Sequence, residues 1–99
     1  MTAGTQADWR PSGPLTLETA GAALAEARRA VADGVSRVDL SGVPQADSAG
    51  LAVLLDLVRE AARREQSLDL VGMPAGLRSL ADLYGVTDLL PLNEAAPGA

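Results

Sequence analysis

The sequence predicts a small α/β domain, in which helices pack mainly on one face of a small mixed β-sheet of about four strands. The chain has 99 residues, which suits a single domain. Residues 35–40 and 68–71 are short apolar runs typical of strands, and the segments around them repeat apolar residues at helical spacing. Strands that alternate with helices in this way indicate β-α-β units.

The ends of the chain predict little regular structure. Residues 1–8 and 93–99 are rich in small and polar residues, so we expect flexible termini and a domain that spans residues 9–92. Two prolines and a glycine lie between Trp9 and Leu15. Because proline cannot donate a backbone hydrogen bond to a neighbouring strand, any strand here is confined to the edge of the sheet.

The first helix is predicted over residues 17–32. Thr16 can cap its N-terminus, and Gly34 stands where a glycine commonly ends a helix. The apolar positions at helical spacing are Ala20, Ala23, Leu24, Ala27 and Val31. In the strand that follows, Val38 and Leu40 lie on the same face, because side chains alternate along a strand.

The second helix begins after Asp47 and has the strongest amphipathic pattern of the chain. Its apolar stripe consists of Leu51, Leu54, Leu55, Val58 and Ala62. We expect this stripe to face the sheet. The outer side of the helix and its N-terminal tip should therefore be exposed.

The last strand and helix are shorter. Residues 68–71 predict a strand, and residues 75–84 predict a helix that ends at Gly85. The apolar stripe of this helix consists of Leu77, Leu80, Ala81 and Tyr84. Because Tyr84 closes the stripe, its position favours packing in the core. Residues 86–90 fit either a final helical turn or a short strand.

The composition excludes several classes of function. The chain contains no Cys, no His and no Lys, so it lacks thiolate nucleophiles and the commonest general base and metal ligand. The formal net charge of −5 argues against nucleic acid binding. No apolar run reaches the roughly 18 residues that span a bilayer, and the N-terminus lacks the features of a signal peptide. We expect a cytoplasmic binding module that is not an enzyme and holds neither metal nor cofactor.

One segment, Asp47-Ser48-Ala49-Gly50-Leu51, combines features of a binding site. It opens the best helix, whose first backbone N–H groups have no acceptor within the helix. Asp47 or Ser48 can cap these groups, and the small Ala49 and Gly50 would let another surface approach closely. The Ser48 hydroxyl could contact a partner or carry a phosphate near the positive helix end. Plain N-capping combined with a tight turn is the structural alternative.

Several stretches resemble a STAS domain. They are V-D-L-S-G-V at residues 38–43, A-D-S-A-G-L-A-V-L-L at residues 46–55, and L-A-D-L-Y-G-V at residues 80–86. The resemblance covers roughly residues 9–92 and implies a strand, a D-[ST]-x-G loop and an amphipathic helix in that order. STAS domains often begin with two strands. Here either the first strand is absent or the sheet begins irregularly at residues 2–8.

Two classes of the STAS family bear on function. In anti-sigma factor antagonists a kinase phosphorylates the serine directly before the glycine, and Ala49 stands at that position here. In the MlaB class a serine or threonine stands one residue earlier, as Ser48 does, and a Leu-Tyr pair is similar to Leu83-Tyr84. This resemblance implies a subunit that docks on the MlaF-like ATPase of a phospholipid-transport ABC complex, which maintains outer-membrane lipid asymmetry.

The resemblance also implies the residues and the location of that contact. The candidate partner-binding residues are Asp47, Ser48, Ala49, Gly50 and Tyr84. The subunit would lie at the inner membrane through its partner, with no direct insertion into the bilayer. The alternative is an anti-sigma factor antagonist that binds an anti-sigma kinase, with Ser48 as the candidate phosphorylation site.

Overall fold

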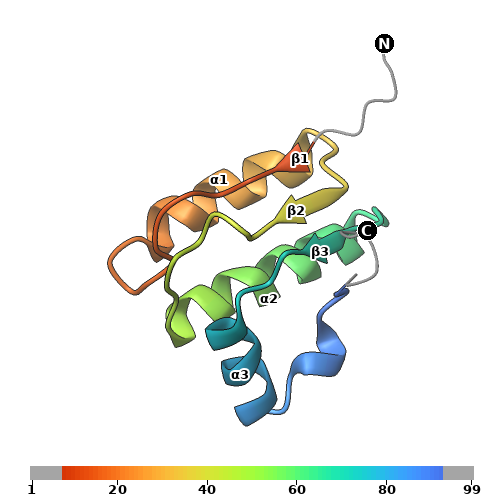
Figure 1. Cartoon of the computed structure of the whole chain (residues 1–99). Coiled ribbons are helices and arrows are strands. Elements are labelled where there is room, and N and C mark those ends of the chain that lie inside the picture. The colour runs from red at the N-terminus through yellow and green to blue at the C-terminus, as the bar shows by residue number, and fades with distance from the viewer. Residues whose placement is uncertain (1–7, 93–99) are drawn as a thin grey trace.

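The computed structural model describes residues 8–92 (Figure 1). Residues 1–7 and 93–99, where we expect flexible termini, lie outside the described residues. In chain order the elements are β1 (Asp8–Trp9), α1 (Ala20–Ala32), β2 (Arg37–Asp39), α2 (Ser48–Arg63), β3 (Asp69–Val71), α3 (Ala75–Leu83) and a 3-10 helix η1 (Thr87–Leu89). Asp8, which the sequence assigns to the N-terminal tail, is therefore part of β1. Within residues 8–92, no helix has the length and apolar composition needed to cross a membrane.

The sheet contains three strands in the order β1-β2-β3, and both pairs are parallel. After each of the first two strands a helix returns the chain to the end of the sheet where that strand began, so the next strand runs beside it in the same direction. A single parallel bridge between Leu70 and Leu92 extends the pairing beyond β3. The α/β class is confirmed, whereas the sequence predicts about four strands in a mixed sheet. β1 is an edge strand, as the prolines that follow it require.

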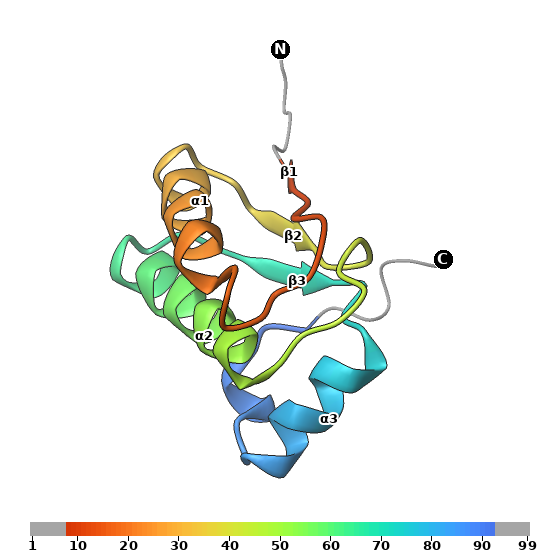
Figure 2. The same ribbon diagram turned by 90° about the vertical axis from the view of Figure 1, so that its left-hand side faces the viewer.

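The two long helices cover one face of the sheet, as predicted. α1 and α2 lie side by side on this face, and α3 lies at the other flank of α2 (Figure 2). The opposite face carries charged side chains. Arg37 pairs with Asp8 across neighbouring strands at 3.3 Å, and Arg10 pairs with Asp39 at 3.0 Å. These exposed ion pairs add little stability, but they keep the open face of the sheet polar.

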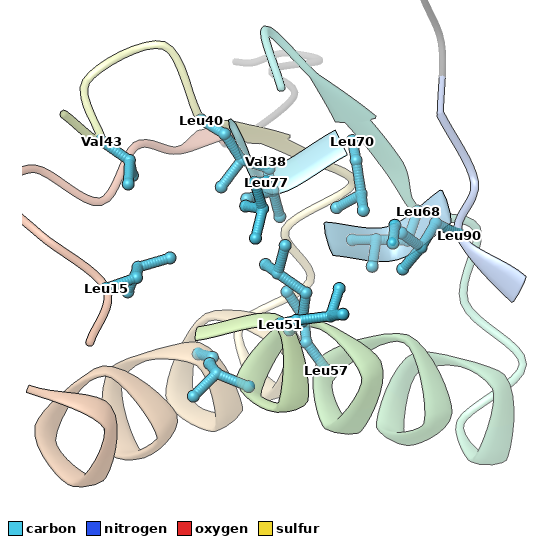
Figure 3. Close-up of a cluster of buried hydrophobic side chains, with 14 of the residues drawn as sticks. Leu15, Val38, Leu40, Val43, Leu51, Leu57, Leu68, Leu70, Leu77 and Leu90 are labelled. Carbon is cyan, nitrogen blue, oxygen red and sulfur yellow. The ribbon is translucent and has the colours of Figure 1, made fainter. Parts of the chain in front are cut away.

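An aliphatic core lies between the sheet and the helices (Figure 3). Its fully buried side chains include Val38 and Leu40 from β2 and the residue after it, Leu70 from β3, and Leu54 and Leu57 from α2. Burying a side chain of this size contributes about 1.5–3 kcal/mol. α2 supplies the most buried residues of any element, so it is the central helix of the domain.

The buried face of α2 differs from the predicted stripe. Leu55 and Val58 are only half-buried, and Ala62 is exposed. The residues of α2 that are buried are Gly50, Leu51, Val53, Leu54, Leu57 and Ala61. The difference arises because α1 packs along one flank of α2. The buried face is therefore turned toward α1 as well as toward the sheet.

α1 begins one turn later than predicted. Thr19, not Thr16, stands at the N-cap position. The backbone N–H of Thr16 donates to Thr19 Oγ1 at 2.9 Å, and the Thr19 hydroxyl donates to the carbonyl oxygen of Pro14 at 2.8 Å. These bonds hold residues 16–19 as a turn and keep them out of the helix.

The end of the chain also departs from its predicted packing. Leu77 and Ala81 of α3 are buried as expected, but Leu80 is half-buried. Tyr84 is 55% exposed, so the prediction that it packs in the core is wrong. Residues 87–89 form η1, which settles the choice between a helical turn and a strand in favour of the turn.

Candidate functional site

The loops that follow the three strands gather at one end of the sheet (Figure 2). In parallel α/β sheets the loops at the carboxyl ends of the strands are the usual place for binding sites. The junction of the β2–α2 loop with α2 holds four of the five candidate residues: Asp47 ends the loop, and Ser48, Ala49 and Gly50 form the first turn of α2. Sequence and topology thus agree on where a site should lie.

Asp47 connects the starts of both long helices. Its Oδ1 accepts hydrogen bonds from the backbone N–H groups of Ala49, at 2.9 Å, and Gly50, at 3.3 Å. Its Oδ2 accepts a third bond from the N–H of Leu17 at 3.0 Å. Asp47 is therefore the N-cap of α2, and it also fixes the turn that precedes α1.

These three hydrogen bonds stabilise the ionised form of the Asp47 carboxyl. The bond from Leu17, followed by those from Gly50 and Ala49, holds the pKa of the Asp47 carboxyl below its ordinary value. Backbone N–H groups occupy both oxygens of the carboxylate, so Asp47 acts in this structure as a hydrogen-bond acceptor that joins two segments of the chain.

Gly50 serves the packing of its own chain. A Cβ at this position would lie 2.8 Å from Leu15 Cβ and closer still to the Leu15 carbonyl oxygen. The segment around Leu15 is held there by two backbone bonds, from Leu15 N to the Gln45 carbonyl at 2.9 Å and from Asp47 N to the Leu15 carbonyl at 3.1 Å. Gly50 is buried, so its small size lets Leu15 approach and leaves no surface for a partner.

Of the four candidate residues at the start of α2, Ser48 is the one that the fold presents to solvent. It is the first residue of α2 and is exposed. Asp47 caps α2, so the Ser48 hydroxyl is not needed as a cap. This hydroxyl makes no hydrogen bond within residues 8–92. Ala49 beside it is half-buried and lines the groove between α1 and α2.

Tyr84 lies on a different element from the other candidates. It follows the last residue of α3 and is exposed together with Leu83, which is 75% exposed. The sequence pattern does not single out Leu17, which is 76% exposed and whose backbone N–H donates to Asp47. The sequence predicts that Leu17 lies in the first turn of a helix, and no local pattern indicates that it is exposed before α1.

The neighbouring loops serve the fold. Asp39 Oδ1 accepts the backbone N–H of Ser41 at 2.9 Å. This bond is the main cause that lowers the pKa of Asp39. A hydrogen bond from the Ser41 hydroxyl and the positive charge of Arg10 lower the pKa further. Gly72 has a φ of 68°, and a Cβ there would lie 2.9 Å from Asp39 Oδ1. Within the described residues no group of three acidic side chains is arranged to hold a metal ion.

The role of Asp47 predicts a pH dependence of stability. Because its pKa is lower in the folded than in the unfolded chain, its contribution is fully present above the unfolded value of about 3.9 and is lost as the pH falls through the folded value. We expect Asp47→Asn to flatten the loss of stability below about pH 4 relative to the parent. Urea unfolding midpoints of both proteins between neutral pH and about pH 3 measure this. If the unfolding midpoints of the parent and of Asp47→Asn fell equally as the pH is lowered, the stabilising role assigned to the Asp47 carboxylate would be contradicted.

The comparison with known proteins agrees with the fold and with the family resemblance found in the sequence. A family model described as MlaB, STAS domain matches residues 10–91. The intermembrane phospholipid transport system binding protein MlaB of Escherichia coli is 36% identical over 69 residues, which cover 69% of this chain and 71% of that protein. MlaB of Haemophilus influenzae is 42% identical over 50 residues, half of this chain and 48% of that protein.

A solved structure shows the same fold at lower sequence similarity. A putative anti-sigma factor antagonist from Thermotoga maritima superposes with a TM-score of 0.72, at 17% identity, over 86% of this chain and 75% of that chain. At this identity the likeness concerns the fold alone. The family model covers most of the chain and agrees with the resemblance found in the sequence. The chain therefore belongs to the MlaB-type STAS domain family.

Proposed function

We propose that this chain is a non-enzymatic partner subunit that binds and supports the ATPase of a phospholipid-transport ABC complex. Membership in the MlaB-type STAS family supports this role, and so do two relatives named as binding proteins of an intermembrane phospholipid transport system. The chain also lacks three of the side chains that most often act as bases or nucleophiles in enzymes, since it contains no His, Cys or Lys. In this role the protein is cytoplasmic and reaches the inner membrane through its partner.

The observation that carries the proposal is that the Ser48 hydroxyl is exposed and available for a hydrogen bond. Its hydroxyl is exposed, makes no hydrogen bond within residues 8–92, and stands on the first turn of a helix that Asp47 fixes. A hydroxyl can donate one hydrogen bond and accept two. The proposed contact surface consists of Ser48, the outer side of the first turns of α2, and Tyr84. Asp47 and Gly50 support this surface from within.

Substitution of Ser48 by arginine tests the surface. Because Ser48 is exposed and is not the cap, we expect Ser48→Arg to cost less than about 1 kcal/mol of folding stability, mainly through its charge near the positive helix end. Binding to the MlaF-like ATPase subunit of the same organism should weaken at least about thirtyfold, as for a central interface residue. Thermal unfolding and titration of the ATPase subunit measure the two effects.

Ser67→Arg is the matched control. Ser67 is exposed and follows the C-terminal end of α2, whereas Ser48 begins that helix. A helix of this length separates its two ends by about 24 Å, so the control adds the same charge far from the proposed surface. Ser67→Arg should bind like the parent. Full binding by folded Ser48→Arg would place the interface elsewhere, and loss of folding would support a purely structural role for Ser48.

The anti-sigma antagonist alternative makes a different prediction for Ser48. In that class a kinase modifies a serine of this loop, and Ala49 occupies the usual position here. Intact-mass and peptide analysis of protein purified from its native cells would detect a phosphate on Ser48. Phosphate there, combined with partner binding that depends on it, would support the alternative over the transport subunit.

A further inference from the structure

The segment before α1 runs beside the segment before α2 (Figure 2). A parallel bridge joins Leu15 to Ala46, so the pairing between β1 and β2 resumes after both strands have ended. On one side of this bridge the Leu15 N–H donates to the carbonyl oxygen of Gln45 at 2.9 Å. On the other side the Asp47 N–H donates to the carbonyl oxygen of Leu15 at 3.1 Å. The chain that leads into α2 is therefore bound to residues from another part of the sequence.

Leu15 contacts the residues on both sides of the Ser48-Ala49 pair. Its carbonyl oxygen accepts the bond from Asp47, and its Cβ occupies space that a Cβ on Gly50 would enter. Leu15 is 3% exposed and belongs to the hydrophobic core, so it cannot shift without disturbing that core. One buried residue thus determines where the first turn of α2 lies.

Leu17 reaches the same turn through the Asp47 carboxylate. The Leu17 backbone N–H donates to Asp47 Oδ2 at 3.0 Å, while Oδ1 accepts from two N–H groups in the first turn of α2. A bond from the Thr19 N–H to the Thr16 carbonyl oxygen, at 3.0 Å, closes a turn in which Leu17 is the second residue. This turn holds the Leu17 N–H toward the carboxylate and so limits how the cap of α2 can move.

We propose that residues 15–17 position Ser48 for its partner, with Leu15 and the backbone N–H of Leu17 as the positioning groups. Within residues 8–92 the Ser48 hydroxyl makes no hydrogen bond of its own, so its location depends on the backbone at the start of α2. A contact that is held in place before binding loses less conformational entropy on binding. The predicted effect on binding rests on the proposed function, whereas the effect on the first turn of α2 does not.

Leu17→Pro tests the bond to Asp47. Proline lacks the N–H and suits the second position of a turn, and Leu17 is 76% exposed, so the variant should fold and lose this bond. Because the bond is the largest cause that lowers the pKa of Asp47, that pKa should rise toward its ordinary value. The amides of Ala49 and Gly50 should exchange with solvent at least about fivefold faster, and the ATPase subunit should bind about fivefold more weakly. NMR titration, hydrogen exchange and titration with the ATPase subunit measure the three effects.

Leu17→Ala is the matched control, because it shortens the exposed side chain and keeps the N–H. It should resemble the parent in all three measurements. If Leu17→Ala changed them as much as Leu17→Pro does, the side chain and not the N–H would be responsible, and the inference would be overturned. An unchanged Asp47 pKa and unchanged exchange in folded Leu17→Pro would overturn it as well.

Leu15→Ala tests the second contact, and Leu15→Met should restore it by filling nearly the same volume. Leu68→Ala is the control for loss of core packing, because Leu68 is also buried and lies at the other end of the core from Leu15 (Figure 3). Relative to the amides in the middle of α2, those of Ala49 and Gly50 should exchange at least about fivefold faster in Leu15→Ala than in the parent. Leu68→Ala should leave this ratio unchanged. Equal ratios in the two variants would mean that general loosening of the core is responsible, and would overturn the role of Leu15.

Binding and exchange together separate this inference from the proposed function. If Ser48→Arg loses binding while folded Leu17→Pro and Leu15→Ala bind like the parent, residues 15–17 do not position the contact and the proposed function stands. If the ATPase subunit does not bind the parent protein, the proposed function and the predicted effect on binding both fall. The exchange measurements then decide whether residues 15–17 hold the first turn of α2.

Discussion

Leu54→Ala is expected to lower the free energy of unfolding by about 2–5 kcal/mol. Leu54 is fully buried at 0% exposure, lies in the middle of α2 and belongs to the hydrophobic core. Truncation removes the transfer energy of the lost methyl groups and leaves a cavity that the surrounding aliphatic side chains fill only in part. Urea unfolding followed by circular dichroism, with both unfolding slopes reported, measures the loss.

Leu80→Ala is the matched comparison. The sequence assigns Leu80 to the same kind of apolar stripe as Leu54, but the structure leaves Leu80 half-buried. Its truncation should cost clearly less than that of Leu54, since part of its surface already contacts water. Equal losses for the two variants, or an unchanged midpoint for Leu54→Ala, would show that the assigned core is wrong.

Gly50→Ala is expected to destabilise the fold by about 1–3 kcal/mol, although alanine favours helices more than glycine does. The added methyl group would meet both the carbonyl oxygen and the Cβ of Leu15. That carbonyl accepts a hydrogen bond from the N–H of Asp47, so Leu15 cannot move aside without weakening this bond. The expected result is a lower thermal midpoint and a displacement of the first turn of α2, which contains Ser48.

Gly21→Ala and Gly76→Ala are the controls for this clash. Both glycines lie in helices, and a Cβ at either one meets nothing within 4 Å. Both substitutions should therefore stabilise the protein slightly, by up to about 1 kcal/mol, because alanine has the higher helix propensity. A stabilising Gly50→Ala would mean that Leu15 does not lie against α2 as the structure shows.

The sequence predicted the elements whose patterns are long or distinctive. The amphipathic repeat located α2, and the apolar runs located β2 and β3, because these signals come from residues close together in the chain. The sequence does not predict β1 clearly, because this strand has two residues and lies directly before a segment with two prolines. The single bridge at Leu92 is too short to produce a strand pattern.

The candidate site was predicted in part. The D-S-x-G-L string predicted that the site lies at the start of α2. It did not predict which other residues of the chain lie around the site. The roles of Asp47 and Gly50 depend on Leu17 and Leu15, which come from another part of the chain. The sequence allowed either Asp47 or Ser48 to be the cap. The structure assigns the cap to Asp47, and this leaves Ser48 exposed.

The sequence by itself determined the α/β class, the aliphatic nature of the core, the family and the position of the Ser48 loop. Each of these depends on composition or on the spacing of nearby residues. The tertiary structure decided which side of α2 is buried, where α1 begins and which candidate residues reach the surface. The contact between Leu17 and Asp47 joins residues 30 positions apart, and the packing of α1 against α2 turns the buried face of α2. Such contacts depend on how the helices pack on the sheet, so no local pattern in the chain can specify them.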